Sequence, residues 1–506
     1  MLVCARLPAM RPGLVWLNLT DIIMYLGLDL GTSGLRGLLV SEQGVPVGDA
    51  TAGYTVQSPK EGWSEQDPAE WVKACRQVLS ELRSTYPKQY AAIKGIGVAG
   101  HMHGATLLDD AGVVIRPCIL WNDSRAVDEA RELDGQSPFR NLSGNIVFAG
   151  FTAPKLMWVA RHEPDHFRRV VKVLLPKDYL VYWLTGRYVS DLSDASGTSW
   201  LDVGERTWSG ELIEKSGMLR SQLPDLVEGC ELVGKLKREV AAESGMSDNV
   251  GVVAGGADNA AAACGIGAIN EGQAFLSLGT SGVLLAAKDH YSPEPESAVH
   301  TFCHALPDKW YQMGVMLSAT DSLNWLASNL GSSAKELTTL LKGKISGPSS
   351  VSFLPYLSGE RTPHNDVNAR AVFLGMSKST DNQELCQAVI EGVSFAMRDC
   401  LEALKSTMTN LSGIYVIGGG SNSEFWVDTL ANVLNLPLYL PVKSDFGAAM
   451  GAARLAMVGT SGAEQTSIMV QPEIRKVFDP NSGLVSAYET AYQKYTRSYQ
   501  ALKEIA

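Results

Sequence analysis

One seven-residue pattern occurs twice in this sequence, about half a chain apart. Residues 28–34 read Leu-Asp-Leu-Gly-Thr-Ser-Gly and residues 276–282 read Leu-Ser-Leu-Gly-Thr-Ser-Gly, so the two copies differ only in Asp29 against Ser277. Each copy is an apolar run that ends in a small, hydroxyl-bearing turn, and a second apolar run follows at once. Such a pattern predicts a β-hairpin with a glycine-rich tip. The repeat therefore predicts a duplicated domain.

The tips of the two predicted hairpins are candidates for phosphate binding. Small residues at a tight turn present backbone N–H groups with no bulky side chain in the way, which suits a phosphate. Two ordinary hairpins are the alternative, and the presence of both copies favours phosphate binding. The candidate nucleotide-binding residues are Gly31, Thr32 and Ser33 in the first copy and Gly279, Thr280 and Ser281 in the second.

Only the first copy carries a carboxylate, that of Asp29. Hard cations prefer carboxylate oxygen as a ligand. We therefore expect Asp29 to hold Mg²⁺, either directly or through a water molecule.

The length and charge of the chain limit what it can be. A chain of 506 residues is too long for one core, and we divide it into domains at 24–268 and 269–506. Residues 1–23 are expected to be a disordered extension or a mis-assigned start. The net charge of −11 argues against binding to nucleic acid or to an anionic membrane, because both need a basic face. No apolar run approaches the ~20 residues of a membrane span, and we expect a cytoplasmic protein.

The cysteines do not indicate a metal or disulfide framework. All eight are scattered and no CxxC pair occurs, which is typical of reduced, buried thiols. His300, Cys303 and His304 form the one close Cys/His group, and half of a tetrahedral zinc set is missing there.

The two common nucleotide fingerprints are absent or misleading. Residues 95–100 match GxGxxG, but Ile96 and Val98 make this stretch a strand, and no helix opens after it. No GxxxxGK[ST] motif occurs. Three predicted strands also precede the first helix, which we expect to be capped by Asp67, whereas a doubly wound nucleotide fold alternates strand and helix. A dehydrogenase is therefore disfavoured.

Two polar clusters follow apolar segments in the first half. His101, Met102 and His103 come directly after the strand at 95–100, at the kind of strand end where α/β proteins tend to bind ligands. Purely structural histidines are the alternative there. The second cluster is Trp-Asn-Asp-Ser-Arg at residues 121–125, which begins with Trp121. The alternative is that these residues form an exposed turn that caps a helix.

Asp258 and Asn259 lie at the start of an alanine-rich helix, directly after Gly255 and Gly256. Such a carboxylate can be a simple helix N-cap. The two glycines, however, let another group approach closely, which favours a site. Asp258 is the carboxylate left over from metal and phosphate binding, so we expect it to accept a proton from an attacking hydroxyl.

Three consecutive glycines separate a predicted strand at 414–417 from a helix that Ser421 and Glu424 are expected to cap. This arrangement gives a flat ledge near the positive end of a helix dipole, where a planar ring or a phosphate could lie. A tight strand-to-helix connection is the alternative. The candidate adenosine-binding residues are Gly418, Gly419, Gly420, Ser421 and Asn422. Residues 354–365 are predicted to be a loop too polar for the core.

Taken together, two phosphate hairpins, a metal-side carboxylate and a free base predict phosphoryl transfer, which depends mainly on positioning and charge neutralisation.

Several segments resemble the FGGY family of carbohydrate kinases, within the actin/hexokinase/Hsp70-like superfamily. Residues 150–158 with Arg161 and His162 match the first family signature, and residues 371–376 with 384–391 match the second. Further similar segments lie at 99–109, 120–123, 174–180, 296–300 and 354–364. The resemblance implies an α/β fold with two duplicated ribonuclease-H-like domains around a nucleotide cleft.

The resemblance also implies a reaction, the ATP-dependent phosphorylation of D-xylulose at O5 with Mg²⁺. It makes Asp258 the catalytic base, makes Met102 and His103 sugar contacts, and puts Asp29 on a carboxylate needed for activity. We add Asn259 to the predicted sugar contacts. The family further suggests a homodimer.

Trp121 completes the predicted sugar contacts, and His101 stands where similar kinases often carry Gln. Two alternatives remain. One is a kinase for another ketose or polyol, such as L-ribulose or glycerol. The other is an actin- or Hsp70-like ATPase without a sugar substrate.

Overall fold

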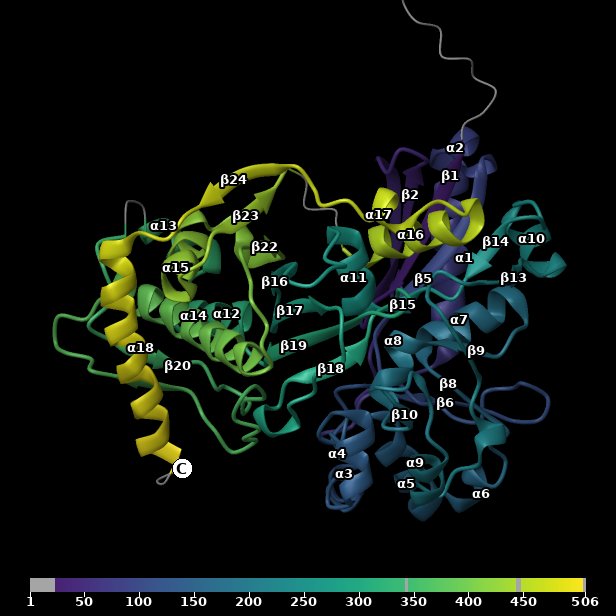
Figure 1. The fold of residues 1–506 in the computed structure, drawn as a ribbon, viewed down its shortest axis with the longest axis horizontal. Helices are drawn as coiled ribbons and strands as arrows, with labels where there is room; N and C mark the ends of the chain where they lie inside the picture. Colours follow the sequence, from purple (N-terminus) through teal and green to yellow (C-terminus); the bar gives the residue numbers. More distant parts are fainter. Residues whose placement is uncertain (1–22, 342–344, 443–446, 504–506) are drawn as a thin grey trace, which may run out of the picture.

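The computed structural model describes residues 23–341, 345–442 and 447–503. Within them the chain forms two large mixed β-sheets that lie side by side, with helices packed around them (Figure 1). The predicted extension at 1–23 lies outside the described residues except for Ile23. In these three ranges, no helix is long and apolar enough to cross a membrane.

The first sheet has seven strands in the order β13-β14-β5-β1-β2-β3, with β15 beside β5. Its strands are β1 (Met24–Leu30), β2 (Gly34–Ser41), β3 (Pro46–Gly53), β5 (Ile93–Gly100), β13 (Leu232–Lys235), β14 (Gly251–Val253) and β15 (Gly256–Ala257). Short strands outside it are β4 (Glu65–Gln66), β6 (Thr106–Leu108), β7 (Cys118–Ile119), β8 (Lys172–Leu174), β9 (Val189–Asp191), β10 (Leu201–Asp202), β11 (Thr207–Trp208) and β12 (Asp225–Val227).

The second sheet also has seven strands, in the order β18-β19-β17-β16-β22-β23-β24. They are β16 (Ala274–Leu278), β17 (Gly282–Lys288), β18 (His300–Cys303), β19 (Trp310–Met316), β22 (Ile414–Ile417), β23 (Leu438–Pro441) and β24 (Ile474–Phe478). A separate pair is formed by β20 (Ser352–Leu354) and β21 (Val372–Leu374).

The two sheets repeat one topology, as the duplicated heptad predicted. In the first, β1 runs antiparallel to β2 and parallel to β5, and β2 runs antiparallel to β3. In the second, β16 runs antiparallel to β17 and parallel to β22, and β17 runs antiparallel to β19. The two heptads form equivalent hairpins, β1–β2 and β16–β17. The predicted duplicated α/β fold is confirmed.

Helices cover both sheets. In the first half they are α1 (Pro68–Thr85), α2 (Pro87–Ala91), α3 (Val127–Asp134), α4 (Ser137–Ser143), α5 (Thr152–His162), α6 (Pro164–Phe167), α7 (Pro176–Thr185), α8 (Leu192–Ala195), α9 (Gly210–Lys215), α10 (Arg238–Ser244) and α11 (Asp258–Ile266). In the second half they are α12 (Thr320–Asn329), α13 (Ala334–Leu340), α14 (Asn382–Ser406), α15 (Glu424–Leu434), α16 (Ala448–Ser461), α17 (Gln465–Ile468) and α18 (Ser482–Lys503).

Helix α1 illustrates how local sequence fixes an element. The Asp67 side chain accepts a hydrogen bond from the Ala69 amide and Pro68 stands at the first helical position, as predicted. Trp71 and Leu82 lie on its buried face. The helix therefore packs its apolar stripe on the first sheet.

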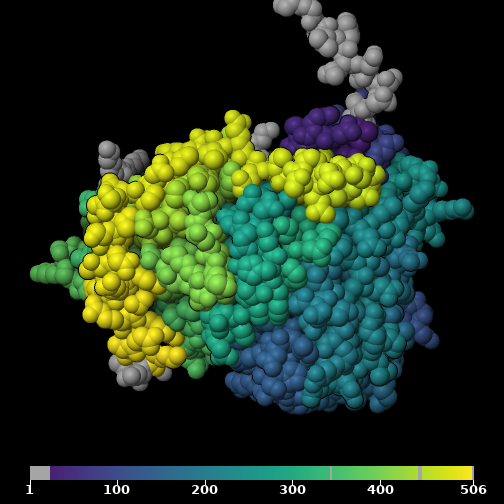
Figure 2. Space-filling view, in the orientation of Figure 1, coloured from purple at the N-terminus to yellow at the C-terminus, as the bar shows by residue number. Residues whose placement is uncertain are grey.

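Helix α16 joins the two halves. It comes late in the chain, yet it packs on β1 and β5 of the first sheet and on α11 (Figure 1). The approach needs glycine, because a Cβ on Gly27 would lie 1.8 Å from the Ala449 carbonyl oxygen and one on Gly451 would lie 1.7 Å from that of Ala261. Figure 2 shows the C-terminal part of the chain reaching across the first half. The predicted division at 268/269 falls between α11 and β16 and stays a prediction.

Two local predictions are wrong. The helix after the glycine run is capped by Ser423, whose side chain accepts from the Trp426 amide, and not by Ser421. Ser421 lies in a short 3-10 turn and its hydroxyl donates to the Gly418 carbonyl. The loop at 354–365 is not outside the core, because Glu360 is 3% exposed. One Glu360 oxygen accepts hydrogen bonds from the backbone amides of Leu317 and Arg361, which helps this carboxyl group to be buried.

Candidate active site

A cavity of about 150 Å³ lies between the two halves of the molecule. It is smaller than the roughly 300–1,000 Å³ of drug-sized sites, so it suits a small molecule. The first half lines it with His101, Met102, His103, Trp121, Asp258 and Asn259, and the second half lines it with Ser281, Val283, His300, Met313, Val315 and Arg361. The four predicted sugar contacts Met102, His103, Trp121 and Asn259 therefore meet in one place with Asp258, which was predicted both to contact the sugar and to act as the base.

Asp258 is the first residue of α11 and not its cap, which is Ala257. The helix-cap interpretation is therefore wrong. One Asp258 oxygen accepts hydrogen bonds from the amide and the side-chain nitrogen of Asn259, at 2.7 and 2.9 Å. Just before it, Gly255 has φ +81°, and a Cβ there would lie 1.7 Å from the Val98 carbonyl oxygen. The glycine thus lets the carboxylate sit directly beside β5.

Asp258 and Asp29 influence each other's charge. Burial raises the pKa of Asp258 to about 7, and the negative charge of Asp29 adds to the shift. Burial also raises the pKa of Asp29 to about 6, while Arg36 acts against it. Two buried carboxylates within electrostatic reach leave one of them ready to accept a proton near neutral pH.

Side chains hold the first hairpin tip from behind. The Tyr54 hydroxyl donates to the Gly31 carbonyl at 2.5 Å, and the Gln66 side chain donates to the Thr32 carbonyl at 2.6 Å. The Trp121 indole N–H donates to the Thr32 hydroxyl at 3.1 Å. Trp121 thus links the tip to the cavity. The helix-capping alternative for its cluster is wrong, because α3 begins later, after Ala126.

The second hairpin tip is held by the start of α12. The amide and hydroxyl of Thr320 donate to the Gly279 carbonyl at 3.0 and 2.7 Å, and the Ala319 amide donates to the Thr280 carbonyl at 2.8 Å. Ser281 lines the cavity. Each tip therefore has its carbonyls occupied from behind.

A larger cavity of about 520 Å³ lies on the second half, over the glycine ledge. Gly419, Gly420 and Asn422, three of the residues predicted to bind adenosine, line it. Gly418 and Ser421 form the turn beneath: Gly418 has φ +88°, and a Cβ there would lie 2.7 Å from the Leu278 carbonyl oxygen. The ledge thus lies against the second hairpin. Sequence reasoning missed the facing wall, which is Thr320, Leu323, Asn324, Ala334, Lys335, Thr338, Ser423 and Trp426.

Three histidines line the small cavity, and burial lowers the pKa of each. The pKa of both His101 and His103 falls to about 3, so these rings are neutral. His103 lies 2.8 Å from the Gly197 carbonyl through Nδ1 and stacks on Phe151 at 4.5 Å. His300 was predicted only as part of a Cys/His group, and its place in the cavity was not foreseen.

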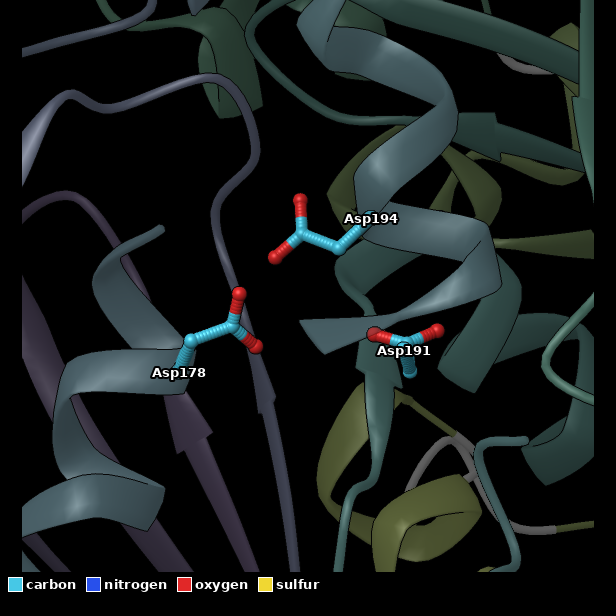
Figure 3. A group of neighbouring side chains, drawn as sticks. All are labelled: Asp178, Asp191 and Asp194. Atoms are coloured by element: carbon cyan, nitrogen blue, oxygen red, sulfur yellow. The ribbon is translucent and has the colours of Figure 1, made fainter. Parts of the chain in front are cut away.

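A buried charged cluster lies next to Asp258 and was also missed. The Lys177 ammonium lies 2.5 Å from Asp178 and 2.7 Å from Asp191. Figure 3 shows Asp178, Asp191 and Asp194 gathered from α7, β9 and α8 around one space. Asp258 is among the charges that raise the pKa of Asp194, after burial and the nearer carboxylates.

Hydrogen bonds connect this cluster to the backbone next to Asp258. Asp191 accepts hydrogen bonds from the amide and the hydroxyl of Ser193. The Ser193 hydroxyl in turn accepts from the Ala257 amide at 3.0 Å, one residue before Asp258. The cluster therefore fixes the start of α11. Its members precede Asp258 by more than 60 residues, so no local motif linked them to that carboxylate.

Comparison with known proteins gives a consistent result. The model of the FGGY family of carbohydrate kinases matches with its N-terminal domain at residues 24–265 and with its C-terminal domain at residues 274–460. The chain is 44% identical to the xylulose kinase of Escherichia coli (strain K12) over 483 residues, 95% of this chain and 99% of that protein.

Solved structures agree. A crystal structure described as a xyloylose kinase from Brucella ovis superposes with a TM-score of 0.94 at 53% identity, covering 96% of this chain and 100% of the other. A xylulose kinase from Rhodospirillum rubrum superposes with a TM-score of 0.88 at 28% identity, covering 95% and 99%. With both family domains matched in order, the chain belongs to the FGGY family of carbohydrate kinases.

Proposed function

We propose that this protein transfers the γ-phosphoryl group of ATP to O5 of D-xylulose. The observation that carries the proposal is the small cavity between the halves, which brings a carboxylate with a pKa of about 7 together with the neutral rings of His101 and His103. The similarity to the xylulose kinase of Escherichia coli supports the choice of sugar.

Asp258 acts as the general base. Its carboxylate accepts the proton of the O5 hydroxyl while O5 forms a bond to the γ-phosphorus, and the bond from that phosphorus to the β-γ bridging oxygen breaks. ADP leaves with the bond electrons. A base whose pKa lies near the working pH is partly ionised and still basic enough to take the proton. Removing such a base typically costs about 10²–10⁴ in rate.

Met102, His103, Trp121 and Asn259 hold the sugar. His103 is neutral, and with Nδ1–H donating to the Gly197 carbonyl, its Nε2 is an acceptor for a sugar hydroxyl. The Lys155 ammonium donates to the His103 carbonyl at 2.9 Å and so fixes this left-handed residue, whose φ is 69°. A fixed ring orients the sugar at little entropic cost.

The nucleotide spans the two halves. The tips at 31–33 and 279–281 grip its phosphates, and residues 418–422 hold the adenosine over the larger cavity. Asp29 fits an Mg²⁺ ion, because it places a carboxylate beside the first hairpin tip, and carboxylate oxygens are preferred ligands of hard cations. When bound, Mg²⁺ would neutralise phosphate charge. Asp29 would hold it directly or through water.

A substrate panel separates this proposal from its alternatives. ADP release is measured with ATP alone and with D-xylulose, L-ribulose, glycerol and xylitol, and the values of kcat/KM are compared. We expect release to depend on sugar and to be highest with D-xylulose. Sugar-independent release would favour an actin- or Hsp70-like ATPase, and a higher kcat/KM with another acceptor would replace the sugar.

We also propose a cytoplasmic homodimer that binds neither nucleic acid nor membrane. The net charge of −11 favours the last two statements. Sedimentation velocity tests the dimer, since a single species at monomer mass over a wide concentration range would contradict it.

A further inference from the structure

Arg361 lines the sugar cavity from the second half of the molecule. It belongs to the loop between β20 and β21 that the sequence predicted to be polar and outside the core. The predicted sugar contacts all come from the first half of the chain. Arg361 is instead a residue of the second half that lines the same cavity.

The backbone around Arg361 is fixed. One Glu360 oxygen accepts from the amides of Leu317 and Arg361, at 3.0 and 2.8 Å. The Thr362 amide donates to the Val315 carbonyl at 3.0 Å, and the Val315 amide donates to the Thr362 hydroxyl at 3.0 Å. The Thr362 hydroxyl in turn donates to the Ala298 carbonyl at 2.9 Å. The loop is therefore pinned to β19 on both sides of Arg361, and the position of the arginine is set before any ligand binds.

The side chain of Arg361 is half-buried, and its guanidinium group faces the cavity without a protein acceptor among the described residues. It lies over the ring of Phe148, with 4.8 Å from Cζ to the centroid. No carboxylate or carbonyl among the residues that the structure describes forms an ion pair or a hydrogen bond with it, and burial lowers its pKa. A guanidinium carries five N–H donors and no acceptor, so it can form hydrogen bonds only with acceptor atoms. Such a group in a cavity wall calls for an oxygen acceptor on a ligand.

The electrostatics indicate which end of the cavity Arg361 occupies. Its charge lowers the pKa of His103 and His300. The pKa of Asp258 is instead set by burial, Asp29 and Asn259. The geometry agrees, because Arg361 lies over Phe148, whose ring centroid is 5.3 Å from that of His300. Arg361 therefore lies at the histidine end of the cavity.

We propose that Arg361 is a specificity-determining residue that donates hydrogen bonds to the carbonyl end of the ketose. The inference rests on the proposed function: a sugar with its terminal hydroxyl at Asp258 directs its opposite end, with the C2 carbonyl, toward Arg361. A carbonyl oxygen only accepts, and a guanidinium only donates, so the two are complementary. A site that hydrogen-bonds one group discriminates against an analogue that lacks it.

The test is the variant Arg361→Met, which keeps a stem over Phe148 and removes the donors. We expect kcat/KM for D-xylulose to fall roughly 10–100-fold, the effect of losing a hydrogen bond to a charged group. Most of the loss appears in KM. With xylitol, the polyol of the same length, the loss is smaller, so the preference for ketose over polyol shrinks. KM for ATP is unchanged.

A second readout separates ligand contact from a structural role. Without sugar, Arg361→Met is expected to melt at or above the temperature of the parent, because it removes a half-buried charge that has no ion-pair partner among the described residues. The increase in Tm on adding D-xylulose is expected to shrink. A lower Tm without sugar together with an unchanged sugar-induced increase would overturn the proposal.

Arg206 provides the matched control. Its guanidinium also lies over an aromatic ring, that of Trp310 at 5.4 Å, but it pairs with Glu228 at 2.8 Å. Arg206→Met should lower Tm and leave the ketose-to-polyol ratio intact. Equal losses with D-xylulose and xylitol in Arg361→Met would contradict the assignment. If the parent enzyme does not phosphorylate D-xylulose at all, the proposed function fails instead, before Arg361 is tested.

Discussion

The first hairpin pairs Asp29 with Arg36 across its two strands, whereas the second pairs Ser277 with Val283 at the same place. The two hairpins have the same strand pairing, but charged side chains occupy this position only in the first hairpin. The first tip is bonded to the sugar-side residue Trp121, whereas the second is bonded to the start of α12 below the nucleotide ledge. The two halves therefore share the hairpin proposed to bind phosphate, while the hairpin carboxylate occurs in the first half alone.

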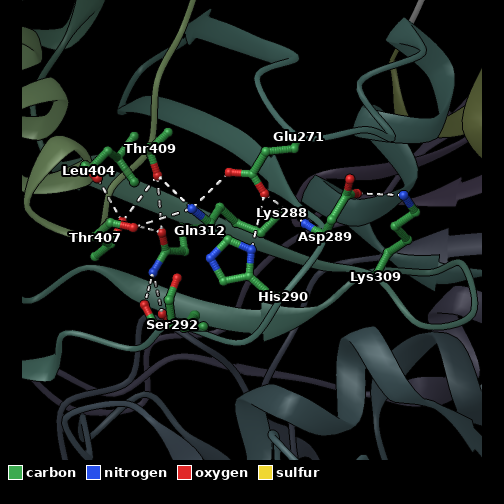
Figure 4. A network of polar contacts seen from close by, with 11 residues as sticks. Glu271, Lys288, Asp289, His290, Ser292, Lys309, Gln312, Leu404, Thr407 and Thr409 are labelled. Carbon is green, nitrogen blue, oxygen red and sulfur yellow. Dashed lines mark hydrogen bonds and ion pairs between the residues drawn. The ribbon is translucent and has the colours of Figure 1, made fainter.

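A buried lysine in each half extends the comparison. Lys177 lies among carboxylates whose hydrogen bonds lead to the residue before Asp258. Lys288 pairs with Glu271 at 2.9 Å and donates to the Thr407 carbonyl at 3.3 Å. Figure 4 shows this second network, which joins β17 to the residues after α14. The network around Lys177 holds the start of α11, where Asp258 lies, whereas the network around Lys288 holds the second sheet.

The largest expected difference between the halves is at the hairpins. Asp29→Asn removes the only hairpin carboxylate, and we expect kcat to fall about 10²–10³-fold, as when a preorganised electrostatic group is lost. Ser277→Ala should change kcat by no more than about twofold. Steady-state rates with D-xylulose measure both. Equal losses would contradict the assignment of charge to the first half.

The buried lysines give an intermediate effect. Lys177→Met leaves buried carboxylates without their cation, which typically costs about 3–5 kcal/mol of unfolding free energy. We expect kcat of the folded fraction to fall by up to about 10²-fold, because the start of α11 shifts. Lys288→Met should lose stability but keep kcat.

Ser193→Ala provides a milder version of the same test. It removes the hydroxyl that accepts from the Ala257 amide and leaves Lys177 in place. We expect a lower kcat with a small change in Tm. An unchanged kcat in this variant, with normal KM for both substrates, would contradict the claim that the buried cluster positions Asp258.

The smallest expected effect is on the pH dependence of stability. The pKa of Asp258 rises from 3.8 to about 7 on folding, so the folded state holds the proton more tightly. Stability from this group is present at low pH and is lost as pH rises through 7. Asp258→Asn does not titrate, so its Tm should exceed the parent's by a few degrees at about pH 8, and the gap should close toward about pH 5. A gap independent of pH would contradict the raised pKa.

The sequence allowed prediction of the elements whose signals are local. The hairpins, the strand at 414–417 and the cap of α1 at Asp67 were readable because turn residues and apolar spacing lie within a few positions. The cap at Ser423 was misplaced by two residues because Ser421 has the same side chain and the strand-to-helix turn holds one extra turn of 3-10 helix.

Long-range packing could not be predicted in the same way. Nothing near α16 in the sequence indicates that it packs on β1 and β5, since its partners precede it by most of the chain. Lys177 and Ser193 serve Asp258 from separate elements for the same reason. Arg361 was missed because a polar loop was taken as exposed, although Glu360 beside it is buried and bonded to backbone amides.

The central claim is that Asp258 takes the proton from the sugar hydroxyl in the cavity between the halves. The most direct test is a single-turnover measurement of phosphoryl transfer from ATP to D-xylulose in Asp258→Asn, with ATP binding measured on the same sample. The account predicts transfer slower by about 10²–10⁴-fold with ATP still bound. Transfer within tenfold of the parent would contradict it.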